Sequence, residues 1–290
     1  METIHTLEWM KQVARQARAD GRPSGFVPTM GALHEGHFSL VRAAQQRCSP
    51  VIASIFVNPT QFGPAEDLEK YPRQMDADRA ALKALGVDYL FAPTAMEMYP
   101  DGFSTYVTVE GLSTRLEGKA RPGHFRGVTT VVLKLFEIVQ PHSAFFGRKD
   151  AQQARIIRQM AADLNLDTQV VTCPTVREAD GLAMSSRNAY LKTEERLAAT
   201  ALYRALEAAK KEIVAGERDA TRLAGVMHSI LNAETRVSVD YAEIVDANTF
   251  ESVTRLRRSC LAVLAVFVGK TRLIDNMLIE EQDGELSVTL

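Results

Sequence analysis

The chain has 290 residues, of which 46% are hydrophobic and 24% are charged, and its formal net charge is −2. This length suits one large domain with a smaller second one, and this composition is typical of an ordinary globular protein. A charge so close to zero gives no electrostatic argument for nucleic acid as a partner, and we expect none.

Five short apolar segments in the first part of the chain predict buried strands. They are rich in β-branched or aromatic residues, are bounded by Gly, Pro or Asn, and lie at 25–28, 51–57, 87–93, 143–146 and 168–171. Helical patterns lie between several of them, at 36–48, 75–86 and 149–165. Because strands and helices alternate, the sequence predicts an α/β fold with a Rossmann-like doubly wound parallel sheet.

The pattern changes after about residue 187. A long amphipathic helix is predicted over 193–216 and a second helix over 220–234. Segments 237–247 and 260–276 then resemble strands that pair with each other. We therefore expect a larger Rossmann-like domain at 1–184 and a small α+β C-terminal domain at 185–290, which could serve as a lid or in dimer contacts.

The loop after the first of these strands, PTMGALHEGH at 28–37, is the strongest candidate for a ligand site. Ligands of doubly wound sheets bind beyond the carboxyl ends of the strands, and a helix N-terminus there offers N–H groups and partial positive charge to a phosphate. His34 and His37 could hydrogen-bond phosphate oxygens and stabilise a five-coordinate transition state. Zinc ligation by the pair, or a solvated pair without a role, are the alternatives; no thiolate or obvious third ligand accompanies them.

His34-Glu35-Gly36-His37 has the H-x-G-H form of class I aminoacyl-tRNA synthetases and related nucleotidyltransferases. Five longer motifs restrict the resemblance to a single family within this group. These motifs are FVPTMGALHEGHFSLV (26–41), FVNPTQF (56–62), YPR (71–73), FFGRKDAQQ (145–153) and PTVREADGLAMSSRNAYL (174–191). In order and spacing the chain resembles the pantothenate synthetases, or pantoate–β-alanine ligases. The resemblance runs from about residue 20 to 191 and more loosely beyond.

The resemblance implies an ATP-dependent ligase that makes a C–N amide bond in two steps. (R)-Pantoate and ATP would give pantoyl adenylate and diphosphate, and β-alanine would then attack the acyl carbon to give (R)-pantothenate, the vitamin B5 precursor of coenzyme A, and AMP. Residues 1–184 would bind ATP and pantoate, Mg²⁺ would arrive on ATP, and the protein would be a homodimer. The expected partners are these small molecules, without nucleic acid or membrane.

By resemblance, most of the expected site residues bind ATP. They are Met30, Gly31, Ala32, Leu33, His34, Glu35, Gly36, His37, Gly147, Arg148, Lys149, Asp150, Val176, Met184, Ser185, Ser186 and Arg187. Four of them would be catalytic: His34 and His37 at the α-phosphate, with His37 a candidate proton donor, and Lys149 and Arg187 at the leaving diphosphate. Arg148 departs from the family, which often has an acidic or amide residue there, so its side chain is assigned no role.

Pantoate and β-alanine are expected to meet a second set of residues. They are Gln61, Gln153, Asn58, Tyr71 and Arg121. An amide offers donors and an acceptor to a substrate with a carboxylate and hydroxyls, and by resemblance Gln61 and Gln153 bind pantoate. Turn capping explains Gln61 equally well.

Several other candidate residues also have an explanation that involves no ligand. A solvated loop accounts for Arg121, His124 and Arg126 about as well as substrate binding does. Glu117, in the same segment, is a weaker candidate for the site. Asp150 could simply cap a helix, and the serines of MSSRN (184–188) could cap the next one. The acids of MDAD (75–78) could hold a divalent ion, but surface acids in the first turn of a helix are commoner.

Other functions stay open beside the ligase. They are another H-x-G-H nucleotidyltransferase and a nucleotide-binding regulator without catalysis.

The N-terminal METIHTLEWMKQ lacks the apolar run of a signal peptide, and Cys48, Cys173 and Cys260 form no C-x-x-C pair. We therefore expect a cytoplasmic protein whose reaction needs no cysteine and whose chain supplies no metal ligands.

Overall fold

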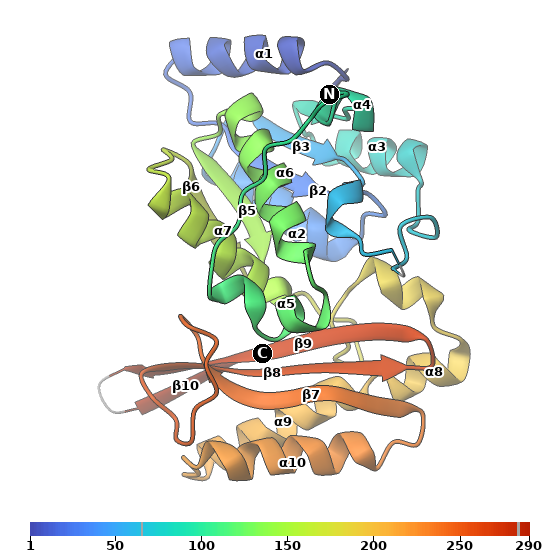
Figure 1. Cartoon of the computed structure of the whole chain (residues 1–290), viewed down its shortest axis with the longest axis vertical. Helices are drawn as coiled ribbons and strands as arrows, with labels where there is room; N and C mark the ends of the chain where they lie inside the picture. Colours follow the sequence, from blue (N-terminus) through green and yellow to red (C-terminus); the bar gives the residue numbers. More distant parts are fainter. Residues whose placement is uncertain (65, 283–284) are drawn as a thin grey trace. The chain divides into compact units, whose positions relative to one another are not determined.

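The computed structural model describes residues 1–64, 66–282 and 285–290. The chain separates into two compact units, the first formed by 1–148 and 152–173 and the second by 149–151 and 174–290. Figure 1 shows the elements of each unit along the chain. The predicted domain division at 184/185 stays a prediction. Among the described residues, no helix is both long and apolar enough to cross a membrane.

A six-stranded parallel sheet forms the centre of the first unit (Figure 1), with the order β1-β4-β3-β2-β5-β6. The strands are β1 Glu2–Ile4, β2 Gly25–Thr29, β3 Val51–Ile55, β4 Tyr89–Phe91, β5 Ser143–Gly147 and β6 Gln169–Cys173. The predicted doubly wound parallel sheet is confirmed, and all strands except β1 match a predicted segment. The strand order reverses between β2 and β5, which is where sheets of this kind bind ligands.

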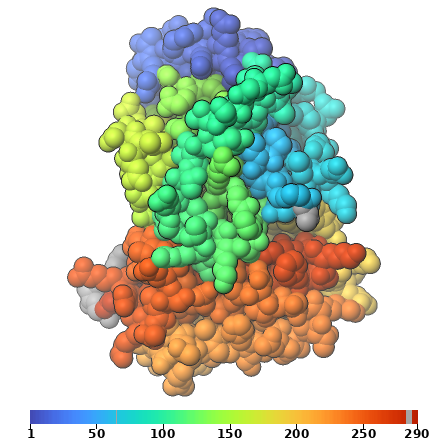
Figure 2. Space-filling model, viewed as in Figure 1, coloured from blue at the N-terminus to red at the C-terminus, as the bar shows by residue number. Residues whose placement is uncertain are grey.

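Helices cover both faces of this sheet. Helices α1 (Leu7–Ala19), α6 (His124–Val139) and α7 (Ala151–Asp163) bury apolar side chains with Phe26 of β2, whereas α2 (Glu35–Gln45) and α3 (Met75–Ala84) do so with Val27. Phe26 and Val27 are both fully buried, as expected of a strand covered on two faces. Helix α1 forms an outer surface of the unit, coloured blue in Figure 2. The shorter elements are η1 Pro59–Gln61, α4 Ala95–Met98, η2 Leu112–Thr114, α5 Glu117–Ala120 and η3 Arg148–Asp150.

Helix α6 begins inside the segment that the sequence analysis treated as a loop, with Arg121, His124 and Arg126, and its continuation to Val139 was not predicted. Its β-branched run, residues 128–132, has a low intrinsic helix propensity. Burial outweighs that propensity, because Phe125, Val128, Val132 and Phe136 recur at helical spacing and all lie in the core. The solvated-loop alternative is therefore wrong for His124, which is buried at the start of this helix.

The second unit is a four-stranded antiparallel sheet with helices on one face. Its elements are η4 Ser186–Tyr190, α8 Thr193–Ala198, α9 Ala201–Val214, α10 Ala220–Asn232, β7 Val237–Asp246, β8 Ser259–Val268, β9 Thr271–Gln282 and β10 Glu285–Thr289. The sheet order is β10-β9-β8-β7, and α9 and α10 pack their apolar side chains against it. The predicted α+β fold and the pairing of β7 with β8 are confirmed.

Two predicted elements of this unit are wrong in extent. The single helix over 193–216 is two helices separated by a turn at 199–200. The single strand over 260–276 is the hairpin of β8 and β9, which turns at Gly269. Gly269 has a φ of +59°, a conformation that glycine adopts without a steric penalty.

Candidate active site

The predicted histidine pair lies beyond the carboxyl end of β2, where α2 begins. The ring centroids of His34 and His37 are 4.1 Å apart and the planes are tilted by 42°. The Gly36 N–H donates to His34 Nδ1 (3.2 Å), and the His34 N–H donates to His37 Nδ1 (3.3 Å). A neutral imidazole that accepts at Nδ1 carries its hydrogen on Nε2. The local backbone therefore holds both rings as Nε2–H donors.

The start of α2 is itself partly occupied by these contacts. The Gly36 N–H already donates to the His34 side chain. The His37 N–H donates to the His34 carbonyl at 2.8 Å. These two backbone groups are thus not open to a phosphate, and the imidazoles are the better placed donors of this turn. Among the residues that the structure describes, no group of three or more His, Cys, Asp or Glu side chains is arranged to hold a metal ion.

Gln61, at the end of η1, is buried and its amide is oriented by Asn58. Asn58 Nδ2 donates to Gln61 Oε1 (3.0 Å), so the Gln61 oxygen is engaged and Nε2, 3.0 Å from Met30 Sδ, is the group it can offer to a ligand. Asn58 Nδ2 also donates to the Gly127 carbonyl (3.1 Å), and Asn58 Oδ1 accepts from the Tyr99 hydroxyl (2.8 Å). The Asn58 amide is therefore used inside the protein, which favours a positioning role over the predicted contact with substrate.

Helix α6 comes unusually close to η1 at this point. A Cβ on Gly127 would lie 2.3 Å from the Thr60 carbonyl oxygen, so only glycine fits there. Tyr99 lies on the other side of Asn58, and burial raises the pKa of its hydroxyl, which therefore stays protonated and donates.

The backbone of Gln61 is held by a second set of side chains. His124 Nδ1 donates to the Gln61 carbonyl (2.8 Å), Arg121 donates to His124 Nε2 (3.1 Å), and Arg121 Nε donates to Glu66 Oε1 (3.0 Å). Burial, and secondarily the Arg121 charge, lowers the pKa of His124 to about 4. His124 is therefore neutral near pH 7, with its hydrogen on Nδ1. Arg121, predicted to bind substrate, is paired with Glu66 in this unit.

The remaining candidates of the first unit differ in burial. Tyr71 is buried and packs edge-on against Phe62, with ring centroids 5.9 Å apart. Gln152 is buried and donates to the carbonyls of Leu112 and Arg115, both at 2.9 Å, so it is structural. Its neighbour Gln153, the predicted pantoate ligand, is half-buried on α7. Gly147 is the last residue of β5 and Arg148 follows it, and a Cβ on Gly147 would meet nothing within 4 Å.

Lys149 and Asp150, which belong to the second unit, are the last two residues of the short helix η3. The distance between Lys149 Nζ and Asp150 Oδ1 is 3.5 Å. Asn276 of β9 donates to the Lys149 carbonyl at 2.8 Å. This contact fixes the backbone from which the Lys149 side chain extends. No local pattern pointed to Asn276, because it lies 127 residues away.

The loop before MSSRN is braced from within the second unit. The Met184 N–H donates to the Val176 carbonyl (3.0 Å), and Arg177 donates to both oxygens of the fully buried Asp275 at 2.7 and 3.0 Å. Asn188 Nδ2 donates to the Ala183 carbonyl at 3.1 Å. These contacts give the loop a defined backbone.

Within MSSRN itself, one predicted phosphate ligand also serves as a cap. The Ser185 hydroxyl accepts from the Arg187 N–H (3.3 Å) and so caps η4, as the capping interpretation anticipated. Ser186 and Arg187 lie in η4, half-buried. Whether phosphate also contacts these residues stays a prediction.

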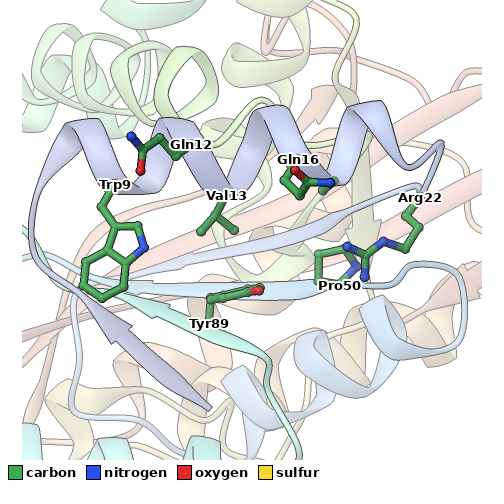
Figure 3. A pocket seen from close by; sticks show the side chains of 8 residues that line it. Trp9, Gln12, Val13, Gln16, Arg22, Pro50 and Tyr89 are labelled. Atoms are coloured by element: carbon green, nitrogen blue, oxygen red, sulfur yellow. The ribbon is translucent and has the colours of Figure 1, made fainter.

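A separate pocket of the first unit is lined by none of the predicted site residues (Figure 3). It is lined by Trp9, Gln12, Val13, Gln16, Ala17, Arg22, Pro50 and Tyr89. Pro50 precedes β3 and Tyr89 begins β4, so this pocket lies at the amino ends of the strands. Ligands of doubly wound sheets bind at the opposite ends, and we therefore do not assign the active site to it.

Comparisons with known proteins give consistent results over nearly the whole chain. The family model described as pantoate-β-alanine ligase matches residues 2–278. The chain is similar to the pantothenate synthetases of Caldicellulosiruptor bescii, at 51% identity over 97% of this chain and 99% of that protein, and of Pelotomaculum thermopropionicum, at 53% identity over 96% and 99%.

Solved structures give the same result. The pantothenate synthetase of Thermus thermophilus superposes with a TM-score of 0.91 at 45% identity, covering 95% of this chain and 98% of that one. The pantoate-β-alanine ligase of Francisella tularensis, solved as a complex with "Beta-gamma ATP" and β-alanine, superposes with a TM-score of 0.77 at 35% identity, covering 95% and 97%.

Proposed function

This chain belongs to the pantoate–β-alanine ligase family, and on that premise we propose that the turn between β2 and α2 is where it activates pantoate. Its activity is that of the family: it joins pantoate to β-alanine through an amide bond, in pantothenate biosynthesis. The observation that carries the proposed site is the imidazole pair, 4.1 Å apart, with both Nδ1 atoms engaged as acceptors.

In the first step, the pantoate carboxylate attacks the α-phosphorus of ATP and the bond to the bridging oxygen of the diphosphate breaks. Negative charge grows on the oxygens of the five-coordinate phosphorus. His34 and His37 donate from Nε2–H to those oxygens, and such donors accelerate the step because they interact more strongly with the transition state than with ATP. His37, in the first turn of α2, is also the candidate proton donor.

The leaving diphosphate carries the remaining negative charge of the triphosphate. We assign its stabilisation to Lys149, Arg187, Ser185 and Ser186, whose ammonium, guanidinium and hydroxyl groups are suited to phosphate oxygens. Mg²⁺ enters as part of the nucleotide substrate. These roles are supported by the residue chemistry and by the family motifs in which the residues stand.

Pantoate is held by Gln61 and Gln153 in this scheme. Because Asn58 occupies the Gln61 oxygen, Gln61 presents its NH₂ group, which matches the carboxylate and hydroxyl oxygens of pantoate as acceptors. Asn58 orients that amide and His124 holds the Gln61 backbone without ligand. This order lowers the entropy lost on binding.

In the second step, the amine of β-alanine attacks the acyl carbon of pantoyl adenylate and AMP leaves. The acyl group is already activated, so no covalent enzyme intermediate is required. Burial raises the pKa of all three thiols, of Cys48, Cys173 and Cys260, and a protonated buried thiol is a poor nucleophile.

We extend the proposal to ligands, assembly and location. The Francisella tularensis complex supports binding of ATP and β-alanine by this chain. A homodimer is supported by the family resemblance, and light scattering on the purified protein tests it. A cytoplasmic location is supported by the three free cysteines, and fractionation of cells tests it.

Oxygen transfer tests the adenylate route directly. Pantoate labelled with ¹⁸O in its carboxylate is turned over with ATP and β-alanine, and the products are analysed by mass spectrometry. Attack at the α-phosphorus leaves one labelled oxygen on AMP. Label in inorganic phosphate instead would mean attack at the γ-phosphorus. Because pantothenate keeps one labelled oxygen in its amide by any route, activation of the carboxylate by ATP would be contradicted by the absence of label from AMP, diphosphate and phosphate alike.

A further inference from the structure

Two acids in the first turn of α3 have opposite environments. Asp76 is on the surface, where its side chain is 91% exposed and pairs with Arg79 at 2.8 Å. Asp78, two residues on, is only 2% exposed. The sequence suggested ordinary surface acids for this turn, and that expectation is wrong for Asp78. A buried carboxylate requires hydrogen bonds that replace its lost hydration.

The replacement comes from the turn that leads to the histidines. Asp78 Oδ2 accepts from the Ala32 N–H (2.8 Å) and Oδ1 accepts from the Leu33 N–H (2.9 Å). Gln74 Nε2 also donates to Oδ1, at 3.3 Å. The two oxygens of one carboxylate thus fix two successive peptide groups directly before His34.

These peptide groups need such support because the turn has an unusual backbone. Gly31 and Ala32 have φ angles of +82° and +50°, and a residue with a side chain rarely adopts the second value. The Gly31 N–H donates to the Thr29 hydroxyl (3.1 Å), and the His34 N–H to His37 Nδ1 (3.3 Å). Side chains therefore hold all four successive N–H groups of residues 31–34, and Asp78 holds the middle two.

The fit between turn and carboxylate is close from both sides. A Cβ on Gly31 would lie 3.1 Å from Asp78 Oδ2 and 3.1 Å from Ile55 Cγ2. A side chain at Gly31 would therefore be crowded against the carboxylate of Asp78. Because the carboxylate accepts from the two N–H groups directly before His34, we expect a change of this carboxylate to shift the peptide that carries His34.

We propose that Asp78 is a positioning residue for the adenylation step: its buried carboxylate clamps the Ala32–Leu33 backbone and thereby sets where His34 and His37 present their Nε2–H donors. Asp78 does not touch substrate and acts through the two imidazoles. This role rests on the proposed function of the histidines. It also requires both carboxylate oxygens as acceptors, which separates Asp78 from an acid that only stabilises the start of a helix.

The test replaces one acceptor without changing side-chain size. In Asp78→Asn, one backbone N–H faces an NH₂ group instead of an oxygen, while Asp76→Asn is the matched control from the same turn. We measure pantoate-dependent exchange of labelled diphosphate into ATP per folded enzyme. We expect Asp78→Asn to lose exchange rate on the order of 10²-fold, the cost of small misplacement of a catalytic group. Its KM for pantoate should stay unchanged, and Asp76→Asn should match the wild type.

A double-mutant cycle with His34→Ala distinguishes positioning from a general structural role. If Asp78 acts through the histidines, Asp78→Asn costs much less in the His34→Ala background than alone. An equal cost in both backgrounds, or a normal exchange rate in Asp78→Asn, overturns the inference. Should Asp78→Asn not fold, Gly31→Ala presses on the same carboxylate from the turn and must show the same kinetic pattern. Absence of exchange in the wild type would instead overturn the proposed function.

Discussion

The buried His124 predicts a specific dependence of stability on pH. Burial lowers its pKa from 6.5 to about 4, whereas the unfolded chain should keep a value near 6.5. Between these values the unfolded state binds the proton and the folded state does not, so stability falls as the pH falls. The contribution is complete above about pH 6.5, decreases as the pH drops from there, and is fully lost below about pH 4.

The size of this effect follows from the two pKa values. A difference of about 2.5 units corresponds to about 3 kcal/mol in total. Linkage places about 1.3 kcal/mol of that loss between about pH 7.5 and pH 5.5, and about as much again by pH 4.5. His124 is only 8% exposed, so solvent screening gives little reason to reduce these values.

The substitution His124→Asn isolates this contribution. The asparagine amide reaches the Gln61 carbonyl much as Nδ1 does, but it does not titrate. Urea unfolding near pH 7.5, 5.5 and 4.5 should show that the wild type loses about 1.3 kcal/mol more than the variant over the first interval. His142→Asn, a change of an exposed histidine, is the control. Parallel losses in wild type and His124→Asn, or an imidazole that titrates near pH 6.5 by NMR, would refute the reasoning.

Three further predictions concern catalysis. His37→Ala should lower kcat by on the order of 10²–10³, the usual cost of one transition-state donor, and an unchanged steady-state kcat would rule out that role. Tyr99→Phe removes the donor to Asn58 Oδ1, and Asn58 in turn orients the Gln61 amide. The KM for pantoate should therefore rise about fivefold, for the loss of ~1 kcal/mol, while the KM for ATP stays constant. A rise in both KM values would argue against a specific effect on Gln61. Replacing Cys48, Cys173 and Cys260 together by Ser should leave turnover per folded enzyme intact, and an inactive but folded triple variant would contradict a reaction without a thiol.

The features that could be predicted from the sequence are those with a local signal. The strand ending at Thr29 is a compact apolar segment, the following turn contains glycine, and His34 and His37 stand at the helix start. Such patterns report secondary structure and the places where strands end. In a parallel sheet those ends share one edge, so the turn after β2 could be predicted as a ligand site from the sequence alone. The structure confirms that the histidine pair stands at this edge, and ligand binding there stays a prediction.

The features that were missed depend on contacts between distant residues. Asp78 bonds to an N–H group 46 residues earlier, and His124 bonds to a carbonyl 63 residues earlier. In sequence, Asp78 resembles an ordinary acid in the first turn of a helix. Asp78 is buried only because α3 packs against the turn between β2 and α2. The same holds for α6, whose β-branched residues disfavour a helix until the core buries them.

Exchange of labelled diphosphate into ATP, with pantoate present and β-alanine absent, tests the central claim most directly. Formation of pantoyl adenylate is reversible, so the account predicts exchange that depends strictly on pantoate and falls on the order of 10²–10³-fold in His37→Ala. Exchange without pantoate, or no exchange in an enzyme that still makes pantothenate from all three substrates, would contradict activation of pantoate as an adenylate at the β2–α2 turn.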